Sequence, residues 1–201
     1  QVSAVSSFRE FIEALQLQVK TTRMSHEQRA RVLQMTQKTN QFNFTTRRLA
    51  ALPAGLEARV THVADRYGDY GLVGVALVRE TADALELDNL LMSCRTLGRG
   101  VEARMLAQVG ELALARAKAW VRIGFVPTER NEPARKFLEA HGLLPAGGDG
   151  WQAFPAQRVA AVAFDPAAAA APVAQPAAAR GASGAAPLTD ADAPDQYERA
   201  A

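Results

Sequence analysis

The apolar residues in the first quarter of the chain change period twice, and each change predicts a different element. Helical spacing predicts a helix over residues 8–15, and strict alternation predicts a half-buried strand over residues 15–22. A Ser-x-x-Gln capping box predicts a second helix over residues 25–37. Thr45 or Thr46 is in a position to cap a further short helix. This quarter of the chain therefore predicts three helices and one strand.

The middle of the chain has the period of β-strands. Two runs rich in β-branched residues, 58–66 and 72–78, are separated by Tyr-Gly-Asp-Tyr-Gly, a connection typical of a hairpin. A third run, 85–92, leads into a glycine-rich turn. These runs predict three strands of one sheet.

The second half of the chain alternates between helices and strands. Residues 101–118 have the helical period, and a helix over residues 131–141 is ended by Gly142. Strands are expected over residues 120–126, 151–154 and 159–164. This order of elements predicts one α/β (α+β) domain with a mixed, largely antiparallel sheet flanked by helices, over residues 1–165.

The composition changes after residue 165. Residues 166–201 contain 16 alanines and five prolines and show no apolar periodicity. Such a segment cannot bury enough apolar surface to offset the entropy lost on ordering. We therefore expect a disordered Ala/Pro-rich linker over residues 166–201.

Charge and composition exclude several classes of function. The net charge of +2 is too small to indicate nucleic-acid binding. A single cysteine, Cys94, excludes an intramolecular disulfide, and the spacing of His26, His62 and His141 is not that of metal ligands, so no metal site is expected. No apolar run approaches membrane-spanning length, and no signal-peptide pattern is present, so no membrane association is predicted. We expect a cytoplasmic protein.

Cys94 stands directly ahead of the turn Arg95-x-x-Gly98-Arg99-Gly100, between a predicted strand and a predicted helix. The backbone N–H groups at the start of a helix attract anions, which predicts a phosphate site at Arg95, Gly98, Arg99 and Gly100. A thiolate beside such a site is stabilised and is a candidate nucleophile. The alternative for Cys94 is a small buried hydrophobic residue at the end of a strand. The alternative for the glycine turn is an ordinary strand-to-helix connection.

This turn, together with the order of elements, is similar to the GNAT acyltransferase fold, in which it binds the pyrophosphate of coenzyme A. The segment Asn131-Glu-Pro-Ala134, followed by Leu138, is similar to the last helix of that fold. Four stretches closely resemble the FkbH-like family, the glyceryl transferase/phosphatases of polyketide assembly lines, and the resemblance covers roughly residues 8–155. These stretches are residues 37–48, 65–75, 91–102 and 125–131.

The resemblance implies a loading reaction. In that family a haloacid-dehalogenase-type phosphatase half precedes a GNAT-like half, and together they load a glyceryl unit from 1,3-bisphosphoglycerate onto the phosphopantetheine of an acyl carrier protein. The Asp-x-Asp-x-Thr hallmark of the phosphatase half does not occur here; Asp190-Ala-Asp192 lacks the threonine. We therefore expect this chain to be one domain of a larger polypeptide, with its tail leading to a carrier protein or the next synthase domain.

A departure from acetyltransferases concerns Leu138. Many GNAT enzymes have a tyrosine at this position, which protonates the leaving thiolate, and leucine cannot donate a proton. Two rival functions remain open: a coenzyme-A-dependent acetyltransferase, which the fold favours, and a non-catalytic module that docks a carrier protein.

The predicted roles follow from the resemblance and from residue chemistry. Cys94 would carry the acyl group as a thioester. His62 or Asp65 would orient it or act as a base; the alternatives are a core histidine and a turn-forming aspartate. Thr128 and Asn131 would bind the pantetheine arm, the alternative for Asn131 being a helix N-cap.

The glyceryl hydroxyls would be bound by the amides of Asn40, Gln41 and Asn43, which alternate with two phenylalanines and would therefore point one way. The alternative is a capped loop with two core aromatics. Arg47 and Arg48 would form a basic rim suited to an acidic carrier protein.

Overall fold

The computed structural model describes residues 10–148 and 150–164. All of them belong to the first of the two compact units into which the chain divides, Gln1–Ala171. The predicted linker, residues 166–201, and the Asp190-Ala-Asp192 segment lie outside the described residues.

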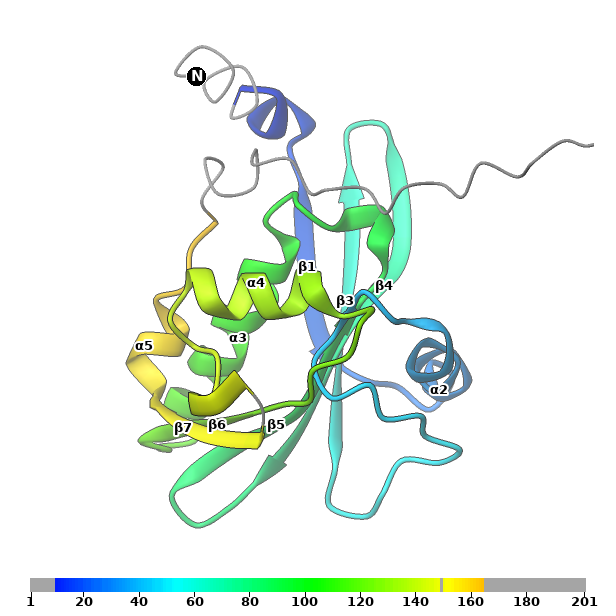
Figure 1. The fold of residues 1–201 in the computed structure, drawn as a ribbon. Helices are drawn as coiled ribbons and strands as arrows, with labels where there is room; N and C mark the ends of the chain where they lie inside the picture. Colours follow the sequence, from blue (N-terminus) through cyan, green and yellow to red (C-terminus); the bar gives the residue numbers. More distant parts are fainter. Residues whose placement is uncertain (1–9, 149, 165–201) are drawn as a thin grey trace, which may run out of the picture. The chain divides into compact units, whose positions relative to one another are not determined.

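The described residues form a seven-stranded mixed sheet (Figure 1). The strand order is β1-β3-β4-β5-β6-β7, and β2 pairs with β5. Every pairing is antiparallel except that of β5 with β6. The strands are β1 (Gln18–Arg23), β2 (Phe42–Asn43), β3 (Glu57–Asp65), β4 (Gly68–Glu80), β5 (Ala84–Met92), β6 (Trp120–Phe125) and β7 (Gly150–Pro155).

Helices cover both faces of this sheet, with α2 on one side and α3, α4 and α5 on the other (Figure 1). The helices are α2 (Arg29–Lys38), α3 (Val101–Ala115), α4 (Glu132–Ala140) and α5 (Ala156–Ala160), with 3-10 turns η1 (Cys94–Thr96) and η2 (Ala146–Gly148). Residues 10–15 are also helical. The mixed, largely antiparallel sheet flanked by helices that the sequence predicts is confirmed.

Alternation along the central strands produces two cores, because successive strand side chains point to opposite faces. On β4, Val75 and Leu77 pack in the core that contains Val32 of α2. Their neighbours Ala76 and Val78 pack in the larger core that α3, α4 and α5 help to form. The sheet is therefore buried on both faces, which explains the nearly continuous apolar run in β4.

The short helix predicted from Thr45 or Thr46 is wrong. Two side-chain amides hold the backbone at the expected start of this helix: the Asn89 Oδ1 accepts from the Thr45 N–H at 3.2 Å, and the Asn43 Oδ1 accepts from the Thr46 N–H at 2.8 Å. Thr46 also has a left-handed backbone, with φ of 54°. A residue with a left-handed backbone does not continue a right-handed helix, so the chain runs irregularly after Thr46.

The strand predicted over residues 159–164 is also wrong, because this apolar run contributes to helix α5 and the turn after it. Helix α5 lies directly against α3 at Gly110. A Cβ atom added to Gly110 would lie 2.2 Å from the backbone nitrogen of Ala160. A short apolar run without clear period does not distinguish strand from helix, and here packing decides.

The close approach at Gly110 gives a prediction about stability. Alanine normally stabilises a helix by about 1 kcal/mol relative to glycine, but a backbone clash cannot be relieved by a rotamer change. We expect Gly110→Ala to lower the free energy of unfolding in urea by about 1–3 kcal/mol. Gly68→Ala is the control: an added Cβ there meets nothing within 4 Å, and we expect a change within about 0.5 kcal/mol. A stabilised Gly110→Ala variant would contradict the α3–α5 packing.

Candidate functional site

The candidate site lies at the edge of the sheet where the parallel strands β5 and β6 end. The two strands pair only from Ala84 to Leu87 on β5, and then diverge. Cys94 and the glycine turn follow β5, while Thr128 and Asn131 follow β6. Because the carboxyl ends of parallel strands meet at one edge, the topology brings both predicted groups to the same edge.

The gap between the diverging strands is bridged by residues 42–44 of the chain itself. Phe42 and Asn43, which form β2, pair antiparallel with the end of β5. The Phe44 N–H donates to the Leu90 carbonyl at 3.1 Å, and the Val126 N–H donates to the Phe44 carbonyl at 2.9 Å. The unpaired backbone groups of both strands thus find partners in one short segment, which the sequence did not predict as a strand.

Asn131 fastens this segment to the end of β6. Its Nδ2 donates to the carbonyl of Asn43 at 3.0 Å and to that of Val126 at 2.9 Å, and its Oδ1 accepts from the Thr128 N–H at 2.7 Å. The side chain is 1% exposed. Both amide hydrogens are therefore used inside the protein. Asn131 occupies the N-cap position of α4, but its side chain makes no capping bond to that helix.

The three amides predicted to bind glyceryl hydroxyls do not point one way. Asn43 is fully buried, and its Nδ2 donates to the Thr39 carbonyl while its Oδ1 holds the Thr46 N–H. Asn40 is half-buried and Gln41 is exposed. The expected common orientation is wrong because residues 42–44 are all buried, so the segment does not alternate. Phe42 and Phe44 are core aromatics, as the alternative had it.

A polar pocket of about 430 Å³ brings two of the predicted binding residues together. Asn40 and Thr128, which are 88 positions apart in the chain, both line it. Arg48 is fixed by hydrogen bonds to the Thr36 carbonyl at 2.6 Å, to the Thr39 carbonyl at 3.0 Å and to Asn40. The pocket is lined by Asn40, Thr46, Arg48, Thr128, Glu129 and Arg130.

The sequence did not single out Arg130, Glu129 or Thr46 for this site. Arg130 makes no hydrogen bond or ion pair with any residue that the structure describes, so its guanidinium is available to a ligand. In the sequence, the one indication of a role for Arg130 was its place in the stretch 125–131, directly before Asn131. The pocket therefore offers amide, hydroxyl and guanidinium donors, which suit hydroxyl or phosphate oxygens.

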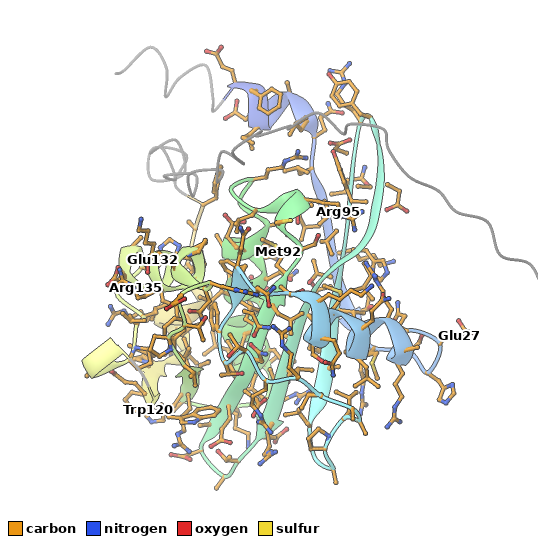
Figure 2. The ribbon with its side chains drawn as sticks, turned by 45° about the vertical axis from the view of Figure 1, so that its right-hand side comes forward. Glu27, Met92, Arg95, Trp120, Glu132 and Arg135 are labelled. Carbon is orange, nitrogen blue, oxygen red and sulfur yellow. The ribbon has the colours of Figure 1, made fainter. Side chains whose placement is uncertain are left out.

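Cys94 is exposed at the start of η1. In Figure 2, Met92 and Arg95 mark the chain on either side of it. The backbone here is held by the Ser93 N–H, which donates to the Val73 carbonyl at 2.7 Å, and by the Leu97 N–H, which donates to the Cys94 carbonyl at 3.3 Å. Since the side chain is exposed, the alternative of a small buried hydrophobe does not hold.

Arg99 and Asp65 are brought together by a residue that the sequence did not single out, Tyr70. Arg99 donates to the Tyr70 hydroxyl at 3.0 Å, and that hydroxyl donates to Asp65 Oδ2 at 2.6 Å. The other oxygen of Asp65 accepts from the backbone N–H groups of Tyr67 and Gly68, at 2.7 and 3.1 Å. Asp65 thus shapes the β3–β4 hairpin turn and connects it to the glycine turn.

These hydrogen bonds bear on the proposed role of Asp65 as a base. The bond from the Tyr70 hydroxyl, with smaller contributions from the two backbone N–H groups and the charge of Arg99, holds the pKa of Asp65 below its ordinary value. A carboxylate with a lowered pKa is a weaker base than an ordinary one. His62 is half-buried on β3 opposite Lys20, and no hydrogen bond joins it to Cys94 among the described residues.

The glycine turn adopts a backbone that only glycine takes easily. Gly98 and Gly100 have φ of 76° and 83°. Arg95 is exposed, and its Nε donates to the Ser93 Oγ at 3.3 Å. The Gly98 N–H, one of the predicted phosphate donors, donates to the carboxyl of Glu102 at 3.0 Å. Glu102 was not singled out from the sequence.

Leu138 is fully buried in the core on α4. Over residues 10–148 and 150–164, no three His, Cys, Asp or Glu side chains gather in a way that would hold a metal ion. No helix in the same residues has the length and apolar character needed to cross a membrane.

No protein-family model and no curated protein matches this chain. Among solved structures, a tandem GNAT protein from the clavulanic acid biosynthesis pathway is similar at 18% identity and a TM-score of 0.45, over 62% of this chain and 43% of that protein. Nourseothricin acetyltransferase is similar at 16% identity and a TM-score of 0.42, over 67% of this chain and 94% of that protein.

The buried amide of Asn131 gives a second prediction. Asn131→Ala leaves the carbonyls of Asn43 and Val126 and the N–H of Thr128 without their partner. An unsatisfied buried polar group costs about 1–3 kcal/mol, so we expect the free energy of unfolding to fall by at least about that amount. Gln41→Ala, at an exposed position in the same segment, is the control, with an expected change within about 0.5 kcal/mol. Equal effects of the two substitutions would show that Asn131 does not fasten the strands.

The Tyr70 hydroxyl gives a third prediction. Tyr70→Phe removes the largest cause of the lowered pKa of Asp65, so we expect that pKa to rise toward its ordinary value. Stability that comes from this carboxylate is lost as pH falls through its folded pKa, and in the variant this loss begins at higher pH. Carboxyl-carbon NMR titration measures the shift. Tyr67→Phe is the control because only the backbone of Tyr67 contacts Asp65; a shift of the same size in both variants would contradict the assignment.

Proposed function

We propose that this domain is an acyltransferase in which Cys94 carries a glyceryl unit as a thioester and passes it to the phosphopantetheine thiol of an acyl carrier protein. The observation that carries the proposal is the exposed position of the chain's single cysteine, at the sheet edge directly ahead of the glycine turn. The resemblance of residues 91–102 to the FkbH-like family supports the choice of the acyl unit and of the carrier protein.

The chemistry is two acyl transfers. The Cys94 thiolate attacks the carbonyl carbon of an acyl phosphate such as 1,3-bisphosphoglycerate; a carbon–sulfur bond forms, the carbon–oxygen bond to phosphate breaks, and phosphate leaves with the electron pair. The phosphopantetheine thiolate then attacks the same carbon, and Cys94 leaves as a thiolate. Between the two transfers, water on a phosphatase-type partner domain hydrolyses the remaining phosphate ester, so that the unit passed to the carrier protein is glyceryl.

This scheme does not need a proton donor at Leu138. Exchange of one thioester for another is nearly thermoneutral, and because the attacking and the leaving groups are both thiolates, the transfer needs no net movement of a proton. In contrast, direct acetyl transfer from coenzyme A would lack the tyrosine that many GNAT enzymes have at this position, because Leu138 is a buried core residue. The leucine at position 138 therefore favours the cysteine relay over a coenzyme-A-dependent acetyltransferase.

The polar pocket supplies groups that suit the rest of the ligand. Asn40 and Thr128 offer an amide and a hydroxyl, and Arg130 offers a guanidinium without a partner among the described residues. Such donors match the hydroxyls of a glyceryl unit or the phosphate of its precursor. Arg48 lines the pocket itself, and its neighbour Arg47 is exposed and paired with Asp88 at 2.5 Å. The positive charge of these two arginines favours an acidic carrier protein.

The test uses a glyceryl thioester of N-acetylcysteamine, a small mimic of an acylated pantetheine arm. We expect incubation with this probe to add one glyceryl group to the 201-residue chain, measured by intact mass, and neutral hydroxylamine to remove it, as it removes thioesters. Cys94→Ala should form no adduct.

The controls separate the proposal from its rivals. Ser93→Ala, next to Cys94 in the chain, should still form the adduct. Retention of the adduct by Cys94→Ala would refute the relay. Turnover of acetyl-coenzyme A without any protein adduct would favour the acetyltransferase, and carrier-protein binding without either signal would favour a docking module.

A further inference from the structure

The backbone donors of the glycine turn already face an anionic group that belongs to the protein. Glu102, in the first turn of α3, is only 7% exposed. Its Oε1 accepts from the Gly98 N–H at 3.0 Å, and the backbone N–H groups of Gly100 and of Glu102 itself also stabilise its charged form. These are the donors that would hold a phosphate at the start of a helix.

The second oxygen of Glu102 makes this more than ordinary helix capping. Oε2 is buried and has no hydrogen-bond partner among the residues that the structure describes. Acidic residues in the first turn of a helix are usually solvated and favoured by the helix dipole. In contrast, a buried carboxyl oxygen without a partner lowers the stability of the fold. Burial raises the pKa of Glu102, and the backbone N–H groups offset only part of that rise.

The outer side of the turn is covered as well. A Cβ atom added to Gly100 would lie 2.6 Å from Cγ and 2.9 Å from Cβ of Phe164, so that side chain packs directly on the turn. The charged residues of the turn face other groups: Arg95 bonds Ser93, and Arg99 bonds Tyr70. No charged side chain is among the causes of the shifted Glu102 pKa.

We propose that Glu102 is the resident anion of the glycine turn, which occupies the donors that a pyrophosphate would need and so selects against free coenzyme A. The choice of coenzyme A as the disfavoured acyl donor rests on the function proposed above. A carrier protein presents its pantetheine arm through one phosphodiester and gains further contacts from its own surface, so it depends less on these donors than a pyrophosphate does.

The physical basis is competition for the same N–H groups. A pyrophosphate can enter the turn only if the Glu102 carboxyl leaves or becomes protonated, because two anions cannot share these donors. Binding is therefore linked to proton uptake, and affinity for pyrophosphate rises as pH falls through the pKa of Glu102. Isothermal titration of the 201-residue chain with inorganic pyrophosphate and with coenzyme A measures both effects.

Two substitutions of Glu102 separate charge from occupancy. Glu102→Gln removes the charge and keeps the shape and the Gly98 hydrogen bond, so the variant is expected to fold. Glu102→Ala also empties the space. At neutral pH we expect weak binding of both probes to the unmodified chain, binding at least about tenfold tighter to Glu102→Gln, and still tighter binding to Glu102→Ala. Only the unmodified chain should gain affinity on mild acidification through this group.

Glu111→Gln is the matched control. It lies on the same helix and removes the same charge, but its side chain is exposed and paired with Arg104 at 2.5 Å. We expect its affinity for pyrophosphate to equal that of the unmodified chain. Tight binding to the unmodified chain at neutral pH, or no gain in either Glu102 variant, would overturn the proposal.

The outcome is independent of the Cys94 test, because the N-acetylcysteamine probe contains no phosphate. If the Glu102 variants gain affinity while the unmodified chain forms no glyceryl adduct, the proposal that Glu102 occupies the turn is supported and the proposed acyl relay is refuted. If the adduct forms at Cys94 while the Glu102 variants gain nothing, the relay stands and the resident-anion proposal falls.

Discussion

The parallel strands β5 and β6 diverge, which leaves backbone N–H and C=O groups without partners in the sheet. The buried amide of Asn131 holds in place the segment that pairs with these groups. Residues 42–44 enter the gap between β5 and β6 and take up hydrogen bonds from both. Asn131 then ties this segment, the end of β6 and the loop after it with three hydrogen bonds of its own. Buried backbone N–H and C=O groups must be paired. The hydrogen bonds of Asn131 therefore fix where residues 42–44 and the loop after β6 lie at the site.

The fastening has a chemical consequence for the ligand. The side-chain amide groups of Asn131 and Asn43 donate to backbone carbonyls of the protein, so they are not available to a substrate. The groups left for binding are at the rim, in the pocket between Asn40 and Thr128. At the same edge of the sheet, the exposed Cys94 directly precedes a turn whose Gly98 N–H donates to Glu102. The site thus combines an exposed thiol and a polar pocket with a turn that is internally satisfied.

The sequence predicted what depends on local period and missed what depends on contacts between distant segments. The β3–β4 hairpin and helices α3 and α4 carry clear strand or helix periodicity, and the structure confirms them. Strand β2 is two residues long, so it has no period to detect; it exists because β5 and β6 diverge. The helix predicted after Thr45 does not form, because Thr46 has a left-handed backbone and the chain there is held by Asn89, 44 positions away.

The candidate site divides in the same way. Cys94 and the glycine turn were found because a thiol and two glycines between a strand and a helix are visible in the sequence. The Asp65–Tyr70–Arg99 connection and the burial of Glu102 were missed, because neither pairing nor burial of a polar residue can be inferred from its neighbours in the chain. Asn43 was assigned to a ligand on the basis of alternation, and the all-buried segment 42–44 has none.

The most direct test of the central claim, that Cys94 is an acyl relay, is a single-turnover transfer. The glyceryl-loaded chain, freed of excess probe, is mixed with a phosphopantetheinylated acyl carrier protein, and the intact masses of both proteins are followed in time. The relay predicts that the glyceryl unit disappears from Cys94 and appears on the carrier thiol at the same rate. Loss of the unit from the chain as free glyceric acid, with no gain of mass by the carrier, would contradict it.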